Sequence, residues 1–358
     1  MAMKKELLKG NIAIAEAAIR AGCRYFFGYP ITPQNEIPMY FSHRLPEVGG
    51  VFVQAESEVA SVNMVFGASA AGARVMTTTS SPGYSLMQEG ISYIAAAELP
   101  SVFVNIVRGG PGLGNIAPAQ SDYFQATRGG GHGDYRLIVL AGNSVQELAD
   151  LTFEAFDLAD KYRNPVLILG DGLLGQMSEP VVLPDFIDID KLPEKPWALK
   201  GAKGEKRNIA RTLWLHPENA VEMHNEHLHQ KYEQIKKDIN RYELYKVEDA
   251  DIIIVAYGSP SRIARSAIDI ARQHNIKAGL IRLISLWPFP ESVILEYAKK
   301  VKKILVVEMS KGQLIDDVKI AANGNAKIWF LGRAGGWVPT EQEIFDKIKQ
   351  IYDEVKML

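Results

Sequence analysis

Short runs of apolar residues alternate with longer amphipathic stretches along the first half of the chain. The runs predict buried strands at 25–27, 51–54, 74–78, 102–107, 137–141 and 165–170, and the stretches predict helices at 11–21, 59–71, 86–97 and 145–162. Several strands are continuous Val, Ile and Leu runs, which is typical of a parallel sheet covered by helices on both faces. We therefore predict a doubly wound α/β domain over residues 1–182.

The second half of the chain has a different pattern. Residues 183–248 contain a proline- and charge-rich arm followed by a polar helix, expected at roughly 217–245. A second series then begins at Asp251, with strands predicted at 252–256, 278–284, 304–307 and 328–331 and helices at 263–273, 292–300, 315–322 and 340–349. We predict a smaller α/β domain over residues 249–358.

Composition narrows the classes of function. The net charge is −2 over 358 residues, with Lys and Arg scattered among Asp and Glu, which argues against nucleic acid as a partner. No apolar run of 18 residues and no signal-peptide pattern are present, so we expect no membrane association and a cytoplasmic location. The single cysteine, Cys23, excludes a disulfide within the chain and an iron-sulfur site built from four cysteines of this chain alone.

The strongest candidate chemistry follows the first strand. Gly28-Tyr29-Pro30-Ile31-Thr32-Pro33 holds a threonine between two prolines, where a buried strand must stop and turn. Glu58 follows the next strand and opens a helix of small residues. Ligands of open α/β sheets bind at the carboxyl ends of the strands, so we expect this hydroxyl and this carboxylate in one crevice. On the residues alone, ordinary turn chemistry is the preferred interpretation of Thr32.

Two further strand ends carry candidate residues. Arg108 follows the strand at 102–107 and enters the glycine-rich segment 109–114, whose backbone can approach a ligand closely. Ser81 and Gly83 follow the strand at 74–78 and are expected in the same crevice, although Ser-Pro-Gly is also an ordinary entry into a helix. Glu56 is interpreted as an acid favoured by the helix dipole.

These segments together resemble a known family. Tyr-Pro-Ile-Thr-Pro after a first strand, Glu-Ser-Glu at 56–58 and Thr-Thr-Thr-Ser-Ser-Pro-Gly at 77–83 are similar to the alpha subunit of 2-oxoacid:ferredoxin oxidoreductases. The resemblance is specific over residues 10–175 and weaker beyond them, where 282–290 and 308–314 look like a transketolase-type C-terminal domain. It implies that the first domain binds the pyrimidine of thiamine diphosphate.

The resemblance also implies roles for single residues. Glu58 aligns with the glutamate that hydrogen-bonds the aminopyrimidine and promotes its imino form, which makes it the implied catalytic residue. Thr32 and Arg108 would bind the substrate, because a planar guanidinium suits a planar carboxylate. The implied cofactor-binding residues are Tyr29, Pro30, Ile31, Glu58, Ser81 and Gly83. No metal ligand is expected on this chain.

Partner subunits follow from the resemblance. Family members oxidatively decarboxylate a 2-oxoacid, transfer the acyl group to coenzyme A and pass electrons to ferredoxin. A beta subunit would share the thiamine diphosphate and supply magnesium and a [4Fe-4S] cluster, with gamma and ferredoxin-like delta subunits completing the complex. Gly170-Asp171-Gly172 begins like the diphosphate motif of thiamine enzymes, but no paired asparagines follow. A second polypeptide is therefore expected to hold the diphosphate.

The substrate and the class of protein leave alternatives. Segments 33–36 and 129–135 look closer to family members that use branched-chain 2-oxoacids, so 3-methyl-2-oxobutanoate is expected and 2-oxoglutarate is the alternative. No basic residue of this region beyond Arg108 and Arg128 obviously awaits a second carboxylate, which agrees with a branched-chain substrate. A catalytically idle assembly subunit is a rival, as is an NAD-binding dehydrogenase. The Gly-x-Gly-x-x-Ala pattern at 112–117 would indicate the latter, but no acid ends the next strand.

Four of the seven histidines, His216, His224, His227 and His229, fall in or near the polar helix. Their spacing fits no zinc signature, because no His-Glu-x-x-His arrangement occurs and no cysteine is nearby. We interpret them as solvated surface or as a contact with another subunit.

Overall fold

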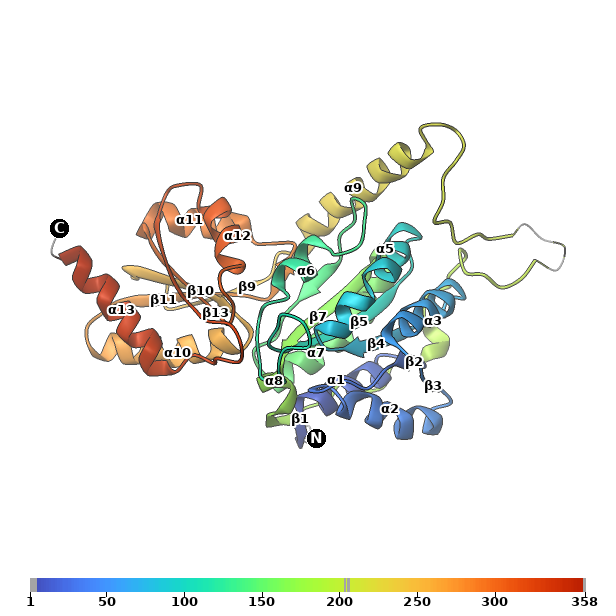
Figure 1. Ribbon diagram of the computed structural model, residues 1–358, viewed down its shortest axis with the longest axis horizontal. Coiled ribbons are helices and arrows are strands. Elements are labelled where there is room, and N and C mark those ends of the chain that lie inside the picture. Colours follow the sequence, from blue (N-terminus) through green and yellow to red (C-terminus); the bar gives the residue numbers. More distant parts are fainter. Residues whose placement is uncertain (1–4, 203, 205–206, 357–358) are drawn as a thin grey trace.

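A computed structural model describes residues 5–202, 204 and 207–356, so the outermost residues of the two expected domains, 1–4 and 357–358, lie outside the described part. The chain forms two large sheets side by side, each covered by helices (Figure 1). The predicted α/β fold is confirmed. No helix in the described residues combines the length and apolar character needed to cross a membrane.

The first sheet has seven strands, in the order β12-β6-β7-β5-β4-β2-β3. Six of them are parallel: β2 (Tyr25–Gly28), β3 (Val51–Gln54), β4 (Val75–Thr79), β5 (Ser101–Val107), β6 (Ile138–Leu140) and β7 (Pro165–Asp171). One group of helices packs together through α1 (Gly10–Arg20), with α2 (Glu36–Glu47) and α7 (Val145–Tyr162) against it. A second group pairs α3 (Glu58–Ala70) with α5 (Gln88–Ala96). The central strands are fully buried, as their continuous apolar runs predict.

The second sheet has five strands, in the order β14-β13-β10-β11-β9. Its strands are β9 (Tyr242–Tyr245), β10 (Ile252–Tyr257), β11 (Ala278–Leu283), β13 (Lys303–Glu308) and β14 (Lys327–Gly332), and only β9 runs antiparallel. Helices α10 (Gly258–Gln273) and α13 (Glu341–Lys356) form one packed pair, and α11 (Glu291–Val301) and α12 (Leu314–Ala322) form another. The remaining elements are a small pair of strands, β1 (Glu6–Lys9) with β8 (Ser178–Val181), and the short helices α4 (Pro82–Leu86), α6 (Tyr123–Arg128), α8 (Gly172–Gln176) and η1 (Ile189–Lys191).

One local prediction is wrong, and two elements were not predicted. The polar helix expected to reach residue 245 ends earlier, as α9 (Ala220–Asp238), and 242–245 form the edge strand β9. Residues 285–287 leave the second sheet and join the first as β12 (Ser285–Trp287), antiparallel to β6. Helix α2 was not predicted, and it contains two prolines, which usually interrupt a helix. Pro38 lies in the first turn, where the missing N–H costs nothing, and Pro46 lies at the last turn.

The two sheets are joined by more than the strand β12. Arg282 of β11 is 6 % exposed and donates to Glu147 Oε2 at 2.7 Å, on the first turn of α7, and to Glu243 Oε2 at 2.8 Å, on β9. This buried cation and its two carboxylate partners connect β11 and β9 of the second sheet to α7 of the first half of the chain. The domain division at residues 182 and 248 stays a prediction, because β12 belongs to the first sheet but follows both boundaries.

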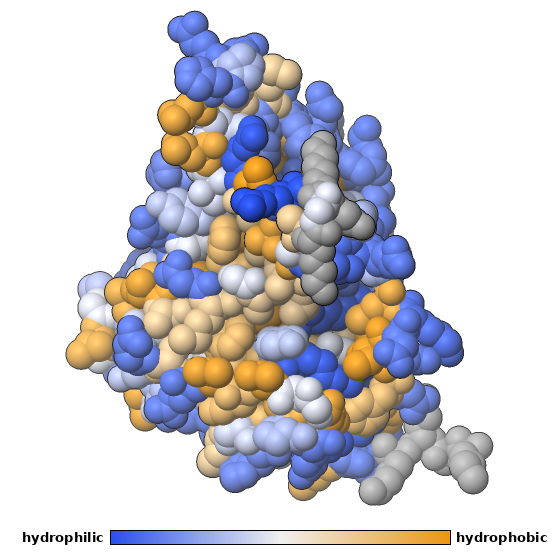
Figure 2. Space-filling view, turned by 90° about the vertical axis from the view of Figure 1, so that its right-hand side faces the viewer, coloured by the Kyte–Doolittle hydropathy of each residue, from blue (hydrophilic) through white to orange (hydrophobic). Residues whose placement is uncertain are grey.

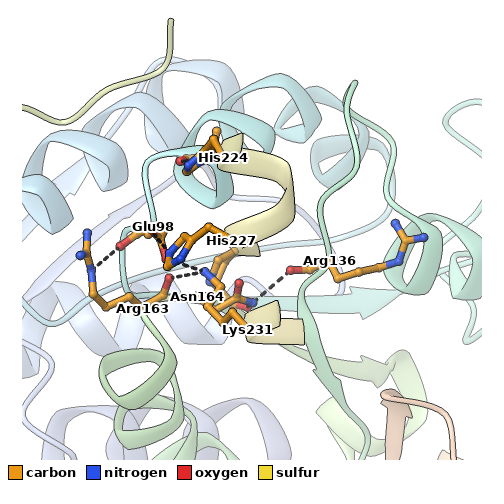
Figure 3. A network of polar contacts seen from close by, with 9 residues as sticks. Glu98, Arg136, Arg163, Asn164, His224, His227 and Lys231 are labelled. Carbon is orange, nitrogen blue, oxygen red and sulfur yellow. Dashed lines mark hydrogen bonds and ion pairs between the residues drawn. The ribbon is translucent and has the colours of Figure 1, made fainter. Parts of the chain in front are cut away.

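Helix α9 packs across the amino-terminal ends of β5 and β7 through a polar network (Figure 3). Glu98, which precedes β5, accepts from Lys231 Nζ at 3.2 Å and lies 3.0 Å from His227 Nε2. Lys231 also donates to the carbonyl of Arg163, which precedes β7, at 3.1 Å. Lys231 and His227 outweigh the effect of burial and hold the pKa of the Glu98 carboxyl below its ordinary value. This network attaches α9 to the first sheet.

His224 lies in the same contact. Its Nε2 is 2.8 Å from the carbonyl oxygen of Ala96, and its ring stacks on Trp214 at 4.3 Å between centroids. The interpretation as solvated surface is therefore wrong for His224, whose half-buried ring is part of the fold. Burial lowers its pKa, because the charged form loses water.

Replacing Arg282 with Ala should lower the free energy of unfolding by about 3 kcal/mol, because the change leaves Glu147 without its buried counter-ion, whereas Glu243 keeps Arg265. Chemical denaturation of the full chain measures the loss. Arg333→Ala is the matched control, because its ion pair with Glu343 is exposed and should contribute less than about 1 kcal/mol. Equal losses in the two variants would contradict the structural role of Arg282.

The depressed pKa of His224 predicts a pH effect on stability. The neutral ring is favoured in the folded chain, so its contribution is complete above the unfolded pKa of 6.5 and is lost as the pH falls through the lower folded value. His224→Phe keeps an aromatic ring on Trp214 but cannot titrate. The melting temperature of the wild type should fall more between pH 7.5 and pH 5 than that of the variant, whereas parallel curves would contradict the prediction.

Candidate functional site

Four neighbouring parallel strands, β5, β4, β2 and β3, end at the same edge of the first sheet. Every residue predicted to act in the site follows one of these ends: Tyr29, Pro30, Ile31 and Thr32 after β2, Glu58 after β3, Ser81 and Gly83 after β4, and Arg108 after β5. The carboxyl ends of parallel strands form the usual ligand-binding edge of such a sheet. The topology therefore brings all four segments to one place.

Glu58 begins α3, and local sequence explains its position. The preceding Ser57 is extended and caps the helix by accepting from the backbone N–H of Ala60 at 3.3 Å, an arrangement worth about 1 kcal/mol. The Glu58 side chain is 4 % exposed, whereas Glu56, two residues earlier, is exposed. A carboxylate in the first turn of a helix is favoured by the helix dipole. Glu58 is thus a buried acid at the edge of the sheet.

The Glu58 carboxyl is enclosed by the end of β4 and by the turn after it. Its one hydrogen bond within the described chain comes from Thr79 Oγ1, at 3.4 Å to Oε1. Gly83 lies directly beside it, and a Cβ added at Gly83 would collide with both Thr79 Oγ1 and Glu58 Oε1. Only glycine fits there with the carboxyl in this position. The structure brings Glu58 and Gly83 together and leaves the carboxyl with unused hydrogen-bonding capacity.

Arg108 connects two other predicted residues. Its Nη1 donates to the carbonyl oxygen of Thr32 at 2.8 Å, and its backbone N–H donates to Ser81 Oγ at 3.1 Å. Its Nη2 donates to the carbonyl oxygen of Leu113 at 2.9 Å, while Nε is buried and has no partner in the described chain. Arg108 is 7 % exposed, and no ion pair joins it to a carboxylate of the described residues. It ties the turn after β2 to the glycine-rich loop after β5.

The turn that carries Ser81 is anchored from behind by buried polar groups. Asn105 lies in the middle of β5 and is fully buried; its Oδ1 accepts from the backbone N–H of Ser81 at 2.9 Å, and its Nδ2 donates to Asp122 Oδ2 at 2.9 Å. Burial raises the pKa of the Asp122 carboxyl, although Ser81 and Asn105 oppose the shift. These hydrogen bonds of Asn105 with Ser81 and Asp122 fix the turn that holds Gly83 against Glu58.

The segment 29–31 contributes backbone rather than enclosed side chains. Tyr29 is 38 % exposed and Pro30 is exposed as well. The Tyr29 and Ile31 carbonyls accept from the Nε2 and the backbone N–H of Gln34, at 3.4 and 3.1 Å. Gln34 in turn accepts from Thr78 Oγ1 of β4 at 2.6 Å through its side-chain oxygen. The described chain places no hydrogen bond between Glu58 and Thr32 or the 29–31 side chains.

Sequence reasoning missed Gln34, Thr79 and Asn105, each of which positions a predicted residue. The signal for Asn105 was visible, because an amide inside the apolar run 102–107 must find buried partners. The signal for Thr79 was weaker, because three successive threonines are ordinary in a strand. Alternation along β4 places Thr79 and Thr78 on opposite faces, toward Glu58 and Gln34.

Two segments with motif-like sequences have structural roles. Asp171 caps α8 by accepting from the backbone N–H groups of Leu173 and Leu174, and its other oxygen accepts from Ser259 Oγ at 2.7 Å. Burial raises its pKa. The glycine-rich loop after β5 folds back on itself through a bridge between Arg108 and Pro118 and opens no helix in the described chain, so it lacks the geometry of a dinucleotide fingerprint.

One cavity adjoins the predicted site, and a larger one lies away from it. One, of about 320 Å³, opens beside Thr32, between the turn after β2, the glycine-rich loop and the start of α8. The other, of about 640 Å³, is lined by Tyr232 and Trp287 and contains none of the predicted site residues. Arg128 lines this second cavity and pairs with Asp317 at 2.7 Å, so it does not serve the cavity beside Thr32.

Comparison with known proteins agrees with this geometry. Residues 16–247 match the family model described as pyruvate flavodoxin/ferredoxin oxidoreductase, thiamine diphosphate-binding, and residues 250–344 match the core domain II of pyruvate:ferredoxin oxidoreductase. The ketoisovalerate oxidoreductase subunit VorB of Methanothermobacter marburgensis is 50 % identical over 352 residues, covering 98 % of this chain and 99 % of that protein. The 2-oxoglutarate synthase subunit KorA of Methanocaldococcus jannaschii is 39 % identical over 369 residues, covering 96 % and 98 %.

Solved structures extend the comparison. A 2-oxoglutarate:ferredoxin oxidoreductase from Magnetococcus marinus, with 2-oxoglutarate, coenzyme A and succinyl-CoA bound, has a TM-score of 0.85 at 29 % identity over 97 % of this chain. This chain spans 65 % of that protein's length. A split-gene transketolase, at 13 % identity and a TM-score of 0.58, shares the fold. From the site, the family models and the relatives together, the chain belongs to the family of 2-oxoacid:ferredoxin oxidoreductase subunits.

Proposed function

We propose that this chain is the subunit that carries the pyrimidine side of a thiamine diphosphate site in a branched-chain 2-oxoacid:ferredoxin oxidoreductase. The complex would convert 3-methyl-2-oxobutanoate, coenzyme A and oxidised ferredoxin into acyl-CoA, carbon dioxide and reduced ferredoxin. The observation that carries the proposal is the buried Glu58 carboxyl, set against Gly83 at the ligand-binding edge of the first sheet. The VorB relative supports the choice of a branched-chain substrate.

The residues present fit one half of the cofactor. The Glu58 carboxyl accepts a single long hydrogen bond, so it can pair with a ring nitrogen. Ser80 Oγ follows β4 and is buried without a partner in the described chain, which adds unused polar capacity at this edge. Tyr29, Pro30, Ile31, Ser81 and Gly83 would surround the ring as cofactor-binding residues. Bound thiamine diphosphate would supply a carbon nucleophile that attacks the keto group of the substrate.

Glu58 would act as the catalytic residue on this chain by holding a proton at the ring nitrogen. Its burial and its position beside Thr79 keep the carboxyl fixed, which a proton-transfer group requires. The Thr32 hydroxyl would donate to the keto or carboxylate oxygen of the 2-oxoacid. Arg108 would bind the substrate carboxylate through N–H groups that its two carbonyl partners leave free.

Other polypeptides would complete the site. This chain has one cysteine, Cys23, whose thiol is buried with its pKa raised to about 12, so it cannot hold a cluster. A beta subunit would provide the magnesium and diphosphate site and a [4Fe-4S] cluster, and gamma and ferredoxin-like delta subunits would pass electrons to ferredoxin. Figure 2 shows apolar side chains gathered on the face that carries α3 and β3, where Val51, Val59 and Met64 are exposed. Because α3 begins at Glu58, this face is the proposed contact with the beta subunit.

The test is Glu58→Gln in the complex reconstituted with its native partner subunits. Turnover of 3-methyl-2-oxobutanoate should fall by about 100-fold or more, because an amide cannot exchange the proton. Glu56→Gln is the matched control, since its carboxylate lies two residues away and is exposed, and it should keep wild-type turnover. Calorimetry of each complex with thiamine diphosphate separates lost binding from lost proton transfer.

Full turnover by Glu58→Gln would favour a catalytically idle assembly subunit and contradict the proposal. The same assay with 2-oxoglutarate decides the substrate, since the KorA relative matches 96 % of this chain and the VorB relative 98 %. Exclusive use of 2-oxoglutarate would overturn the branched-chain assignment and leave the role of Glu58 intact.

A further inference from the structure

The cavity beside Thr32 has three walls of different character. The turn after β2 provides a hydroxyl and a proline ring, α8 begins at a glycine, and the glycine-rich loop provides one apolar side chain, Ile116. A Cβ added at Gly172 would lie 3.3 Å from Pro33 Cγ and 3.6 Å from the Ile116 carbonyl oxygen, so these walls approach each other closely. The cavity, of about 320 Å³, is lined by Thr32, Pro33, Asn35, Glu36, Ile116, Gly172 and Gln176.

The distance between two of the walls is fixed by Arg108. One guanidinium nitrogen bonds the carbonyl of Thr32, on the turn, and another bonds the carbonyl of Leu113, on the loop. Arg108 is almost completely buried, and both bonds are partly buried. Arg108 therefore holds the glycine-rich loop close to the turn that carries Thr32.

The neighbours of Ile116 are held as well. Asn115 accepts from the backbone N–H of Ala117 at 3.0 Å and donates to the Gly335 carbonyl, in the second half of the chain, at 3.1 Å. The Ala117 carbonyl accepts from the backbone N–H of Gly109 at 2.9 Å. Ile116 itself is 64 % exposed and belongs to none of the hydrophobic clusters. Ile116 is thus an exposed β-branched residue that lines the cavity and belongs to no hydrophobic cluster.

The charges around the cavity disfavour a second carboxylate on the ligand. Among the described residues that line it, Glu36 is the ionisable one. Its carboxylate accepts from Asn11 and Gln176 at 2.8 and 2.9 Å, and Lys9 lies 3.3 Å away at the surface. Burial raises the pKa of Glu36, but a hydrogen bond from its own backbone N–H and these side-chain donors outweigh that effect and hold the pKa below its ordinary value. No cationic side chain of the described residues lines this cavity to receive a distal carboxylate.

We propose that Ile116 is a specificity-determining residue that contacts the alkyl side chain of the 2-oxoacid. With the head group of the substrate at Thr32, the branched alkyl group occupies the cavity against Ile116 and Pro33. The contact removes apolar surface of both partners from water, which is favourable in free energy. An exposed isoleucine contributes a large apolar area to this burial. This inference rests on the proposed function, because it assumes that the 2-oxoacid binds at Thr32.

The experiment compares substrates with the same head group. The reconstituted complex is assayed for kcat/KM with 3-methyl-2-oxobutanoate and with pyruvate, which has no branch to reach the cavity. Ile116→Ala should lower the ratio of the two values by about tenfold, because it deletes contact with the branched group alone. Ile116→Trp should lower the ratio at least as much by filling the cavity. Both variants alter an exposed side chain, so the fold is retained.

Ile320→Ala is the matched control. Ile320 has the same side chain and similar exposure, 68 %, but lies on α12 in the second half of the chain. It should leave the ratio unchanged. A ratio that stays within about twofold of wild type in both Ile116 variants, or an equal loss with both substrates, would overturn the assignment. A wild-type complex that oxidises neither 2-oxoacid would instead contradict the proposed function.

Discussion

The close approach of the Glu58 carboxyl to the backbone of Gly83 is the constraint on which the site depends. Glu58 lies at the start of α3 and Gly83 in the turn after β4, so their contact joins two neighbouring strand ends. Hydrogen bonds of the buried Asn105 with Ser81 and Asp122 hold the turn after β4. Arg108 links this turn to the turn after β2. The turns that carry Thr32 and Gly83 are therefore joined through Arg108 by hydrogen bonds, and Glu58 meets them through its close contact with Gly83.

Much of the fold could be predicted from hydrophobic pattern, because central parallel strands are apolar on both faces and helices repeat their apolar positions. The strand 51–54 and the helix 145–162 were placed as they occur. Local rules failed where tertiary context decides the outcome. Strand β12 pairs across to the first sheet, and no local feature of Ser285–Trp287 shows that partner. Helix α2 contains Pro38 in its first turn, where the missing N–H removes no helical hydrogen bond, and it ends one residue after Pro46.

The candidate site was predictable to a different degree. Strand ends could be located from sequence, and parallel topology then required that Thr32, Glu58, Ser81 and Arg108 share an edge. The partners of those residues could not be located, because hydrogen bonds between segments depend on packing. Arg108 was expected to face a substrate carboxylate. In the structure it donates to two backbone carbonyls and so connects the turn after β2 to the glycine-rich loop. In the sequence, Ile116 belonged only to the Gly-x-Gly-x-x-Ala pattern at 112–117. The structure shows that it lines the cavity beside Thr32.

The most direct test of this account is a structure of the complete complex with thiamine diphosphate bound. The account predicts a Glu58 carboxyl oxygen within hydrogen-bonding distance, about 3 Å, of a nitrogen of the cofactor's pyrimidine ring, with Gly83 still against the carboxyl. It also predicts that the diphosphate and its metal ion are held by another polypeptide. A pyrimidine ring that binds away from the carboxyl ends of β3 and β4, without contact to Glu58, would contradict the account.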